Sequence, residues 1–254
     1  MIDTHAHLEK EFYNNEEIKN AIDNARNNGI KLIINSGNDI NSSKEVIKVA
    51  EENSDIMRVT IGIHPNAVND SFESDLNELK KLINHPLVIG VGECGLDYFR
   101  SSNKQEQINA FRKQLDLAAE YQLPAVIHSR DARVDVYNIL SEYELTGIIH
   151  CFAGSLEEAK QFIELGYYIG IGGVVTFKNS DLKEIVKELD LNYITLETDA
   201  PFLSPVPFRG EKNEPARIKE IAEFIGEIKG ISASEVSEIT NNNVLRIFDK
   251  IGDL

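Results

Sequence analysis

Short apolar runs alternate with amphipathic segments along the whole chain. The runs are rich in Ile and Val and mostly lack an alternation of polar and apolar positions, as expected for strands that are covered on both faces. They predict eight strands, at Ile2–His5, Lys31–Asn35, Arg58–Ile63, Leu87–Gly92, Ala125–His128, Gly147–His150, Tyr168–Ile171 and Tyr193–Glu197.

The segments between these runs carry apolar residues at helical spacing. In Glu16–Asn28, Ile18, Ile22 and Ala25 fall on one face, and Gly29 follows where a helix commonly ends. The same pattern predicts helices at Ser42–Asn53, Ser74–Asn84, Lys104–Tyr121, Asp131–Glu142, Ser155–Leu165, Ser180–Leu189, Glu214–Lys229 and, as an extra C-terminal helix, Glu235–Ile251.

The spacing of the strands indicates the fold. The predicted strands begin roughly every 27 residues, which is about the length of one strand with its crossover helix. Eight such units predict an α/β protein with a single (β/α)8 TIM barrel over residues 1–254. No break in composition marks a second domain, and a doubly wound open sheet is the alternative.

Composition and charge limit the function. Of the 254 residues, 42% are hydrophobic and 27% are charged, which is an ordinary globular mixture. The 26 Lys and Arg against 42 Asp and Glu give a net charge of -16, which excludes binding of nucleic acid through a general basic field. A phosphate held locally by metal ions and one or two Arg or Lys side chains stays compatible with this charge.

The sequence also bears on location. No apolar run approaches the roughly 18 residues of a membrane span, and the N-terminus lacks the basic and apolar regions of a signal peptide. The two cysteines, Cys94 and Cys151, suit a reducing compartment and are expected to be packed thiols. We therefore expect a cytoplasmic protein with no membrane partner and no obligate protein partner.

The segment Asp199–Pro215 differs from the rest of the chain. It contains four of the seven prolines and follows the last predicted strand. We therefore expect a stiff loop over one mouth of the barrel, where irregular loops usually carry function.

Histidines gather where the predicted strands end. His5, His7, His64, His128 and His150, five of the six in the chain, lie at or just past the C-terminal ends of strands. In a barrel these ends converge on the rim where active sites are built. His5 and His7 are two residues apart, so in an extended chain both imidazoles can reach one metal ion. Taken alone, the His5 and His7 pair is equally compatible with two ordinary exposed or core histidines.

Two carboxylates share this position. Glu93 ends the fourth predicted strand among glycines and can bridge two cations, or form an ion pair at the rim. Asp199 follows the eighth strand and can bind metal, accept a proton from water, or cap the loop. Glu197 lies one layer deeper, where it supports a ligand or forms a buried ion pair. Together, four imidazoles and two carboxylates suffice for two metal sites that share one carboxylate.

At these positions the sequence resembles the TatD family of metal-dependent deoxyribonucleases, in the amidohydrolase superfamily. The resemblance runs in family order across residues 3–215, nearly the full chain. The matching segments are Asp3-Thr4-His5-Ala6-His7-Leu8, Gly62-Ile63-His64-Pro65, Gly92-Glu93-Cys94-Gly95-Leu96-Asp97-Tyr98, His128-Ser129-Arg130-Asp131-Ala132, His150-Cys151-Phe152-Ala153-Gly154, Leu196-Glu197-Thr198-Asp199-Ala200-Pro201-Phe202-Leu203 and Pro207-Phe208-Arg209-Gly210.

The resemblance implies a barrel that binds two divalent metal ions (Mg, Mn or Zn) and hydrolyses phosphodiesters. The residues that look like ligands of the first metal are His5, His7, Glu93 and Asp199. Those that look like ligands of the second are Glu93, His128 and His150. His64 and Arg209 look like contacts to the substrate phosphate. Glu93 and Asp199 are then the catalytic carboxylates.

The chain departs from the family pattern at two places. Glu211-Lys212 stands where many relatives carry two basic residues, and Asn66 stands where relatives often carry another His. Both departures lower the local positive charge, and with it the expected affinity for long nucleic acid.

Three hypotheses for the function follow. The leading one is a deoxyribonuclease that removes nucleotides from single strands in the 3′-5′ direction, with a short footprint at the site. The alternative keeps the metals and changes the bond, as in an ester or amide hydrolase such as a D-aminoacyl-tRNA deacylase. A binding or scaffold protein without turnover is the third, and the complete ligand set argues against it.

Tyr98, Phe99 and Phe202 near the mouth either stack on bases or pack within loops.

Overall fold

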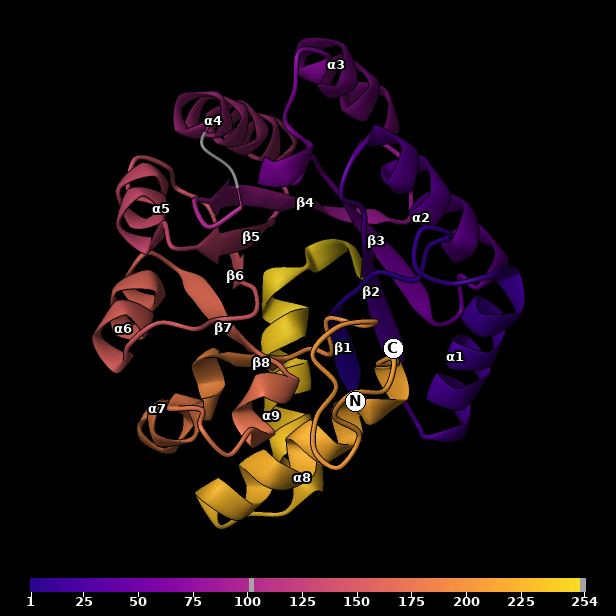
Figure 1. Cartoon of the computed structure of the whole chain (residues 1–254), viewed down its shortest axis with the longest axis vertical. Helices are drawn as coiled ribbons and strands as arrows, with labels where there is room; N and C mark the ends of the chain where they lie inside the picture. The colour runs from indigo at the N-terminus through magenta and orange to yellow at the C-terminus, as the bar shows by residue number, and fades with distance from the viewer. Residues whose placement is uncertain (101–102, 252–254) are drawn as a thin grey trace.

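A parallel barrel organises the chain. The structure, a computed structural model, describes residues 1–100 and 103–251. In them eight parallel strands pair in sequence order into a nearly closed ring, with helices outside it, so the predicted (β/α)8 barrel is confirmed (Figure 1). The strands are β1 (Ile2–Ala6), β2 (Leu32–Ser36), β3 (Met57–Ile61), β4 (Val88–Asp97), β5 (Ala125–Arg130), β6 (Gly147–Ile149), β7 (Tyr167–Ile171) and β8 (Ile194–Leu196).

Helices follow the strands, and all but the last cover the outside of the barrel. Within the described residues they are α1 (Asn15–Asn27), α2 (Ile40–Glu52), α3 (Phe72–Leu82), α4 (Lys104–Tyr121), α5 (Arg133–Leu140), α6 (Leu156–Glu164), α7 (Leu182–Glu188), α8 (Ile218–Lys229) and α9 (Ala233–Ile247). Their buried faces pack on the outer faces of the strands in one large apolar cluster. Of the described helices, none is long and apolar enough to cross a membrane.

Two strands are longer than the apolar pattern predicts. β4 continues through Glu93 to Asp97, and β5 continues through His128 to Arg130. The predictions ended these strands at Gly92 and His128 because the apolar runs stop there. At these strand ends Glu93, Asp97 and His128 carry polar groups that contact one another, whereas Cys94 and Leu96 pack in the apolar core.

Some helix boundaries also differ from the predictions. α3 begins at Phe72, before the predicted capping residue Ser74. The helix predicted from Glu214 starts as a 3-10 turn and becomes α8 only at Ile218. The last predicted helix ends early because Phe248, with φ -114° and ψ 87°, has left the helical conformation, and a separate 3-10 turn follows it.

α9 closes the N-terminal end of the barrel. Val244, Ile247, Phe248 and, in the turn that follows, Ile251 form a second apolar cluster with strand residues. The strand residues of this cluster are Ile2, Leu32, Ile34, Ile89, Val126 and Ile148. Figure 1 shows α9 at the centre of the ring of strands. The helix that the sequence predicts as an addition to the barrel is therefore part of its core.

The seam between β8 and β1 is held by a buried carboxylate. Asp3 accepts hydrogen bonds from the backbone N–H of Thr198 at 2.9 Å and from its hydroxyl at 2.5 Å. Just above, the backbone N–H of Asp199 donates to the carbonyl of His5 at 2.9 Å. These contacts tie the end of the chain's last strand to its first strand, and they fix Asp199 beside β1.

Candidate metal centre

Side chains from six strands meet at the C-terminal end of the barrel. They are His5 and His7 from β1 and the residue after it, His64 after β3, Glu93 in β4, His128 in β5, His150 after β6 and Asp199 after β8. Their side chains are 17% exposed or less. The convergence on one rim follows from the parallel topology, which puts the carboxyl ends of all strands on the same side.

Glycines allow β4 to bring Glu93 against β5. Gly92 has φ +151°, and a Cβ there would lie 2.6 Å from the carbonyl oxygen of Val126. Gly95 has φ +145°, and a Cβ there would lie 2.0 Å from the carbonyl oxygen of His128. Only glycine fits at such close approaches of two backbones.

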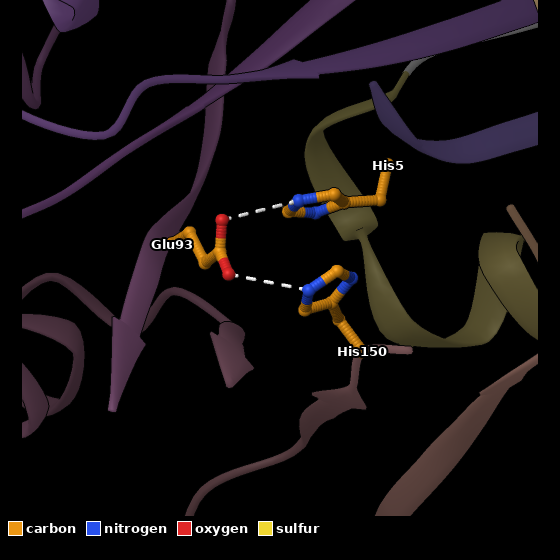
Figure 2. A group of neighbouring side chains, drawn as sticks. All are labelled: His5, Glu93 and His150. Atoms are coloured by element: carbon orange, nitrogen blue, oxygen red, sulfur yellow. Dashed lines mark ion pairs between the residues drawn. The ribbon is translucent and has the colours of Figure 1, made fainter. Parts of the chain in front are cut away.

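Glu93 is the centre of the cluster. Its Oε1 lies 2.7 Å from Nδ1 of His128 and 3.2 Å from Nε2 of His150. Its Oε2 lies 3.3 Å from Nε2 of His5 and 3.5 Å from Nε2 of His7. Figure 2 shows the carboxylate beside the rings of His5 and His150, with one oxygen directed at each. A single carboxylate therefore joins imidazoles from β1, β5 and β6.

Asp199 extends the cluster on the β1 side. Its Oδ1 lies 3.5 Å from Nε2 of His7, which in turn lies 3.0 Å from Nε2 of His5. The Asp199 side chain is 13% exposed, against 4% for Glu93. Asp199 therefore lies nearer to the mouth than the central carboxylate.

The outer nitrogens of the imidazoles are held by groups behind the centre. Nδ1 of His7 lies 3.0 Å from the carbonyl oxygen of Ser36, and Nδ1 of His5 lies 3.1 Å from the Ser36 hydroxyl. Nδ1 of His150 lies 3.2 Å from Oε1 of the buried Glu197. A proton on Nδ1 leaves the Nε2 lone pair directed at the centre, which is how supporting groups prepare a histidine to bind metal. This buried contact of Glu197 fits both roles that the sequence allows for it, support of a ligand and a buried ion pair.

The arrangement fits divalent cations. Three groups have ligand atoms that all lie within 4.8 Å of one another: His5, Glu93 and His150; His5, His7 and Asp199; and His64, Glu93 and His128. With protons on both Nδ1 atoms, Nε2 of His5 and Nε2 of His7 present two lone pairs to each other at 3.0 Å. A cation between them satisfies both. Imidazole and carboxylate are also the donor set of Zn and Mn sites.

Burial and charge shift the pKa values of the cluster. Burial opposes the charge on Glu93, but the surrounding imidazoles, with His150 the strongest, hold its pKa well below the usual range. Burial also opposes protonation of His150, but Glu93 and Glu197 raise its pKa well above the usual value. At His7, Asp199 and Glu93 likewise outweigh burial and raise the pKa to about 9. Protons and a metal ion compete for the same lone pairs, so bound metal displaces these protons.

His64 behaves differently from the other imidazoles. Burial lowers its pKa to about 3, so the ring is neutral. Its Nδ1 accepts a hydrogen bond from the backbone N–H of Asn66 at 3.1 Å, which leaves the ring proton on Nε2. Nε2 lies 3.6 Å from Oε1 of Glu93. His64 therefore presents a neutral N–H donor to the centre.

Asp97 belongs to the site and was missed from the sequence. It is 1% exposed, and its Oδ2 lies 3.4 Å from Nε2 of His128 and accepts a hydrogen bond from the Asn66 amide at 3.0 Å. The signal was present: Asp97 is four residues after Glu93 in one strand, and a period of two puts both on the same face. Asn66 orients this carboxylate. In the sequence, Asn66 stands out only because relatives often carry a His at its position.

Arg209 lies on the rim and not among the imidazoles. It is exposed, and its guanidinium lies 3.9 Å from the centroid of the Phe177 ring. Its loop is anchored by Asn213, whose side-chain amide donates to the carbonyl oxygens of Thr198 and Phe202 at 2.8 and 2.7 Å. The loop is therefore held by a buried amide, and among the described residues Arg209 forms no ion pair that would fix it.

The aromatic residues at the mouth divide into two kinds. The Tyr98 hydroxyl donates to Asp135 at 2.7 Å, so Tyr98 packs within the loops. Phe99 is 63% exposed and Phe202 is 44% exposed. The Phe202 ring also lies 5.1 Å from that of Phe12, edge to face. Exposed rings beside the centre are available for contact with a ligand.

Neither cysteine is in the cluster. Cys94 is fully buried, with its thiol 3.9 Å from the carbonyl oxygen of Val126. Burial raises the pKa of both the Cys94 and Cys151 thiols far above neutrality, so both stay protonated. No group of candidate metal ligands within residues 1–100 and 103–251 includes either of them.

Known proteins are similar to this chain over nearly its whole length. A family model described as TatD related DNase matches residues 2–249. The uncharacterized metal-dependent hydrolase YabD of Bacillus subtilis (strain 168) is 41% identical over 253 residues, which cover 98% of each protein.

Two solved structures share the fold over nearly their full length. The crystal structure of YjjV, a TatD homolog from Escherichia coli K12, has a TM-score of 0.92 and 29% sequence identity, with 98% of each chain covered. A hydrolase TatD family protein from Entamoeba histolytica has a TM-score of 0.88 and 26% identity, with 98% of this chain and 97% of that chain covered.

Proposed function

The chain belongs to the TatD-related DNase family, and from this premise we propose that it is a divalent-metal-dependent hydrolase that cleaves phosphodiester bonds of DNA. The observation that carries the proposal is the Glu93 carboxylate, which contacts imidazoles from three strands, one of which, His7, also lies 3.5 Å from Asp199. We propose further that the substrate is a single strand cut in the 3′-5′ direction.

The proposed ligand sets follow the two oxygens of Glu93. His5, His7 and Asp199 lie on the Oε2 side, and His128 and His150 contact Oε1. Divalent cations held there would neutralise the anionic phosphodiester and the developing charge on the leaving oxygen. Glu93 is then the shared ligand, and its low pKa keeps it ionised for that role.

Asp199 is the proposed base. Burial opposes its charge, but His7 and the other imidazoles lower its pKa, so the carboxylate is ionised at neutral pH. Its position nearer the mouth lets it accept a proton from an attacking water. At the same site, the Nε2–H of His64 donates to a phosphate oxygen, and the Arg209 guanidinium offers a planar fork to the phosphate from the rim.

The acidic surface favours a short substrate footprint. With a net charge of -16, the chain repels a long polyanion except where cations are held at the site. A strand end needs only the centre and a few rim groups. This supports removal of terminal nucleotides over cutting within a long duplex.

A labelled nucleotide ladder tests the proposal. A single strand with a 5′ label, incubated with the protein and Mg, Mn or Zn, is expected to shorten stepwise from its 3′ end. Glu93→Gln and Asp199→Asn should each lower the rate more than about 100-fold, because even groups behind metal ligands cost 10–100-fold. The matched control Glu142→Gln changes an exposed carboxylate paired with Arg112 and keeps the rate.

Three outcomes would contradict the proposal. Internal cuts alone would remove the terminal mode of action, and no cleavage with any of the three metals would remove the nuclease. Faster cleavage of a D-aminoacyl ester than of the oligonucleotide would replace it with the acyl-ester hydrolase that uses the same residues.

A further inference from the structure

Two arginines at the mouth are held by aromatic rings and not by carboxylates. The Arg130 guanidinium lies 4.0 Å from the centroid of the Phe99 ring, and the Arg209 guanidinium lies 3.9 Å from that of Phe177. Within residues 1–100 and 103–251 neither arginine forms a salt bridge. Four other arginines do pair with Asp or Glu, namely Arg26, Arg112, Arg133 and Arg217.

The ring contact is what distinguishes these two arginines. Arg58 and Arg246 also form no salt bridge within the described residues, but their guanidinium groups donate to backbone carbonyls and to Asn243. A ring face holds the guanidinium plane in position without using its N–H groups, which stay free to donate. The two stacked arginines are therefore oriented and unneutralised.

Arg130 lies above the metal centre. It is two residues after His128 in β5, so it points to the same side and lies about 7 Å nearer the mouth along the strand. Its partner across the ladder is Asp97, whose Oδ2 lies 3.4 Å from Nε2 of His128. Oδ1 of Asp97 accepts the backbone N–H of Phe99 at 3.0 Å and fixes the turn that carries the ring. The Phe99–Arg130 pair thus lies one layer above the Asp97–His128 pair.

We propose that Arg130, held by Phe99, binds the phosphate that neighbours the cleaved one in the substrate strand. The inference rests on the proposed nuclease function and adds a second anion subsite to it. Arg209 lies in the loop after β8, on another side of the ring of strands from β4 and β5, so the two arginines approach a bound strand from different directions. The stacking orients the guanidinium before the substrate arrives, which lowers the entropy cost of binding.

Thymidine dinucleotides test the subsite. TpT carries only the phosphate to be cleaved, whereas pTpT and TpTp each add one phosphate on a defined side. One of the two is expected to have a kcat/KM about tenfold or more above that of TpT, the range of a hydrogen bond to a charged group. Arg130→Gln should remove this advantage. The matched control Arg133→Gln, which alters an arginine paired with Glu158 on α5, should keep it.

Binding distinguishes this inference from the proposed function. Affinities of the three dinucleotides are measured by calorimetry in the Asp199→Asn background, with and without Arg130→Gln. If no dinucleotide is cleaved but the added phosphate still tightens binding through Arg130, the nuclease proposal fails and the subsite stands. If cleavage occurs and neither added phosphate helps, or its advantage survives Arg130→Gln, the subsite is wrong and the nuclease stands. If no dinucleotide is either cleaved or bound, both are wrong.

Phe99→Leu examines the role of the ring. Leu keeps an apolar side chain but cannot stack, so the advantage of the added phosphate should fall about two- to fivefold, as expected for an exposed cation–ring contact. The KM should change and kcat should not, because the ring acts only by orienting Arg130. An unchanged advantage would show that stacking does not prepare the subsite.

Discussion

The two ends of the barrel are built from the same strands and differ in nearly every physical property. At the C-terminal end, imidazoles and carboxylates gather around Glu93 and contact one another. At the N-terminal end, Phe248 and its neighbours from α9 fill the space between the strands with apolar side chains. β1 contributes to both, with Ile2 in the apolar cluster and His5 in the polar one.

One barrel can thus serve stability at one end and chemistry at the other. Burying a charged cluster costs free energy, because polar groups lose water and regain it only in part through partners. Apolar burial at the opposite end offsets that cost. Changes at the two ends should therefore be separable, with the apolar end affecting mainly unfolding and the polar end mainly activity.

The largest difference between the effect on stability and the effect on activity is expected from Phe248→Ala. The ring is 1% exposed inside the barrel, and its loss leaves a cavity, so the free energy of unfolding should fall by about 3–5 kcal/mol. Denaturant unfolding measures this, and kcat per folded molecule should stay near that of the wild type. Leu245→Ala on the same helix is the control, because Leu245 is 42% exposed and should cost less than about 0.5 kcal/mol. A large fall in kcat with unchanged unfolding would show that the two ends are coupled.

A change behind the metal centre gives the reverse pattern. Glu197→Gln keeps the shape of a fully buried side chain but removes the charge that faces Nδ1 of His150 at 3.2 Å. Metal affinity is expected to fall about 10–100-fold, as for other groups that orient metal ligands. Titration with metal measures it, and activity should recover at high metal concentration. Lost activity that metal cannot restore would indicate a direct role in the reaction and not a positioning role.

The smallest effect is expected at an exposed ion pair near the apolar end. Arg26 bonds Asp55 at 2.9 Å before β3, and the guanidinium lowers the pKa of Asp55 below its usual 3.8. The stabilisation is therefore present above pH 4 and is lost as the pH falls through the folded pKa. Arg26→Gln should reduce the free energy of unfolding by less than about 1 kcal/mol at neutral pH, since solvent screens the pair.

The pH series sharpens that measurement. The difference between Arg26→Gln and the wild type should shrink as the pH falls below 4, and approach zero once the pH is below the lowered pKa of Asp55, where the carboxylate is protonated in both proteins. Lys48→Gln, at an exposed lysine on α2, is the control and should show no such trend. A difference that grows on acidification would mean that Arg26 stabilises the fold in another way.

Most of the fold follows from local patterns in the chain. A strand covered on both faces requires an unbroken apolar run, so the runs locate eight strands within a few residues. The pattern failed where polar contacts bury a strand, as in Glu93 to Asp97, because hydrophobicity no longer reports burial there. It also described the last helix as an addition, since a helical period does not tell what the helix packs against.

The residue types at the carboxyl ends of the strands can be read from the chain, because the alternation of strand and helix repeats along it. Which of these residues touch is visible only in the folded barrel. It brought His5, His128 and His150 to one carboxylate, added Asp97 to them, and left Arg130 and Arg209 on ring faces at the mouth. The physical reason is that these contacts join residues far apart in the chain, and their geometry depends on how the closed sheet twists and packs, which no local pattern records.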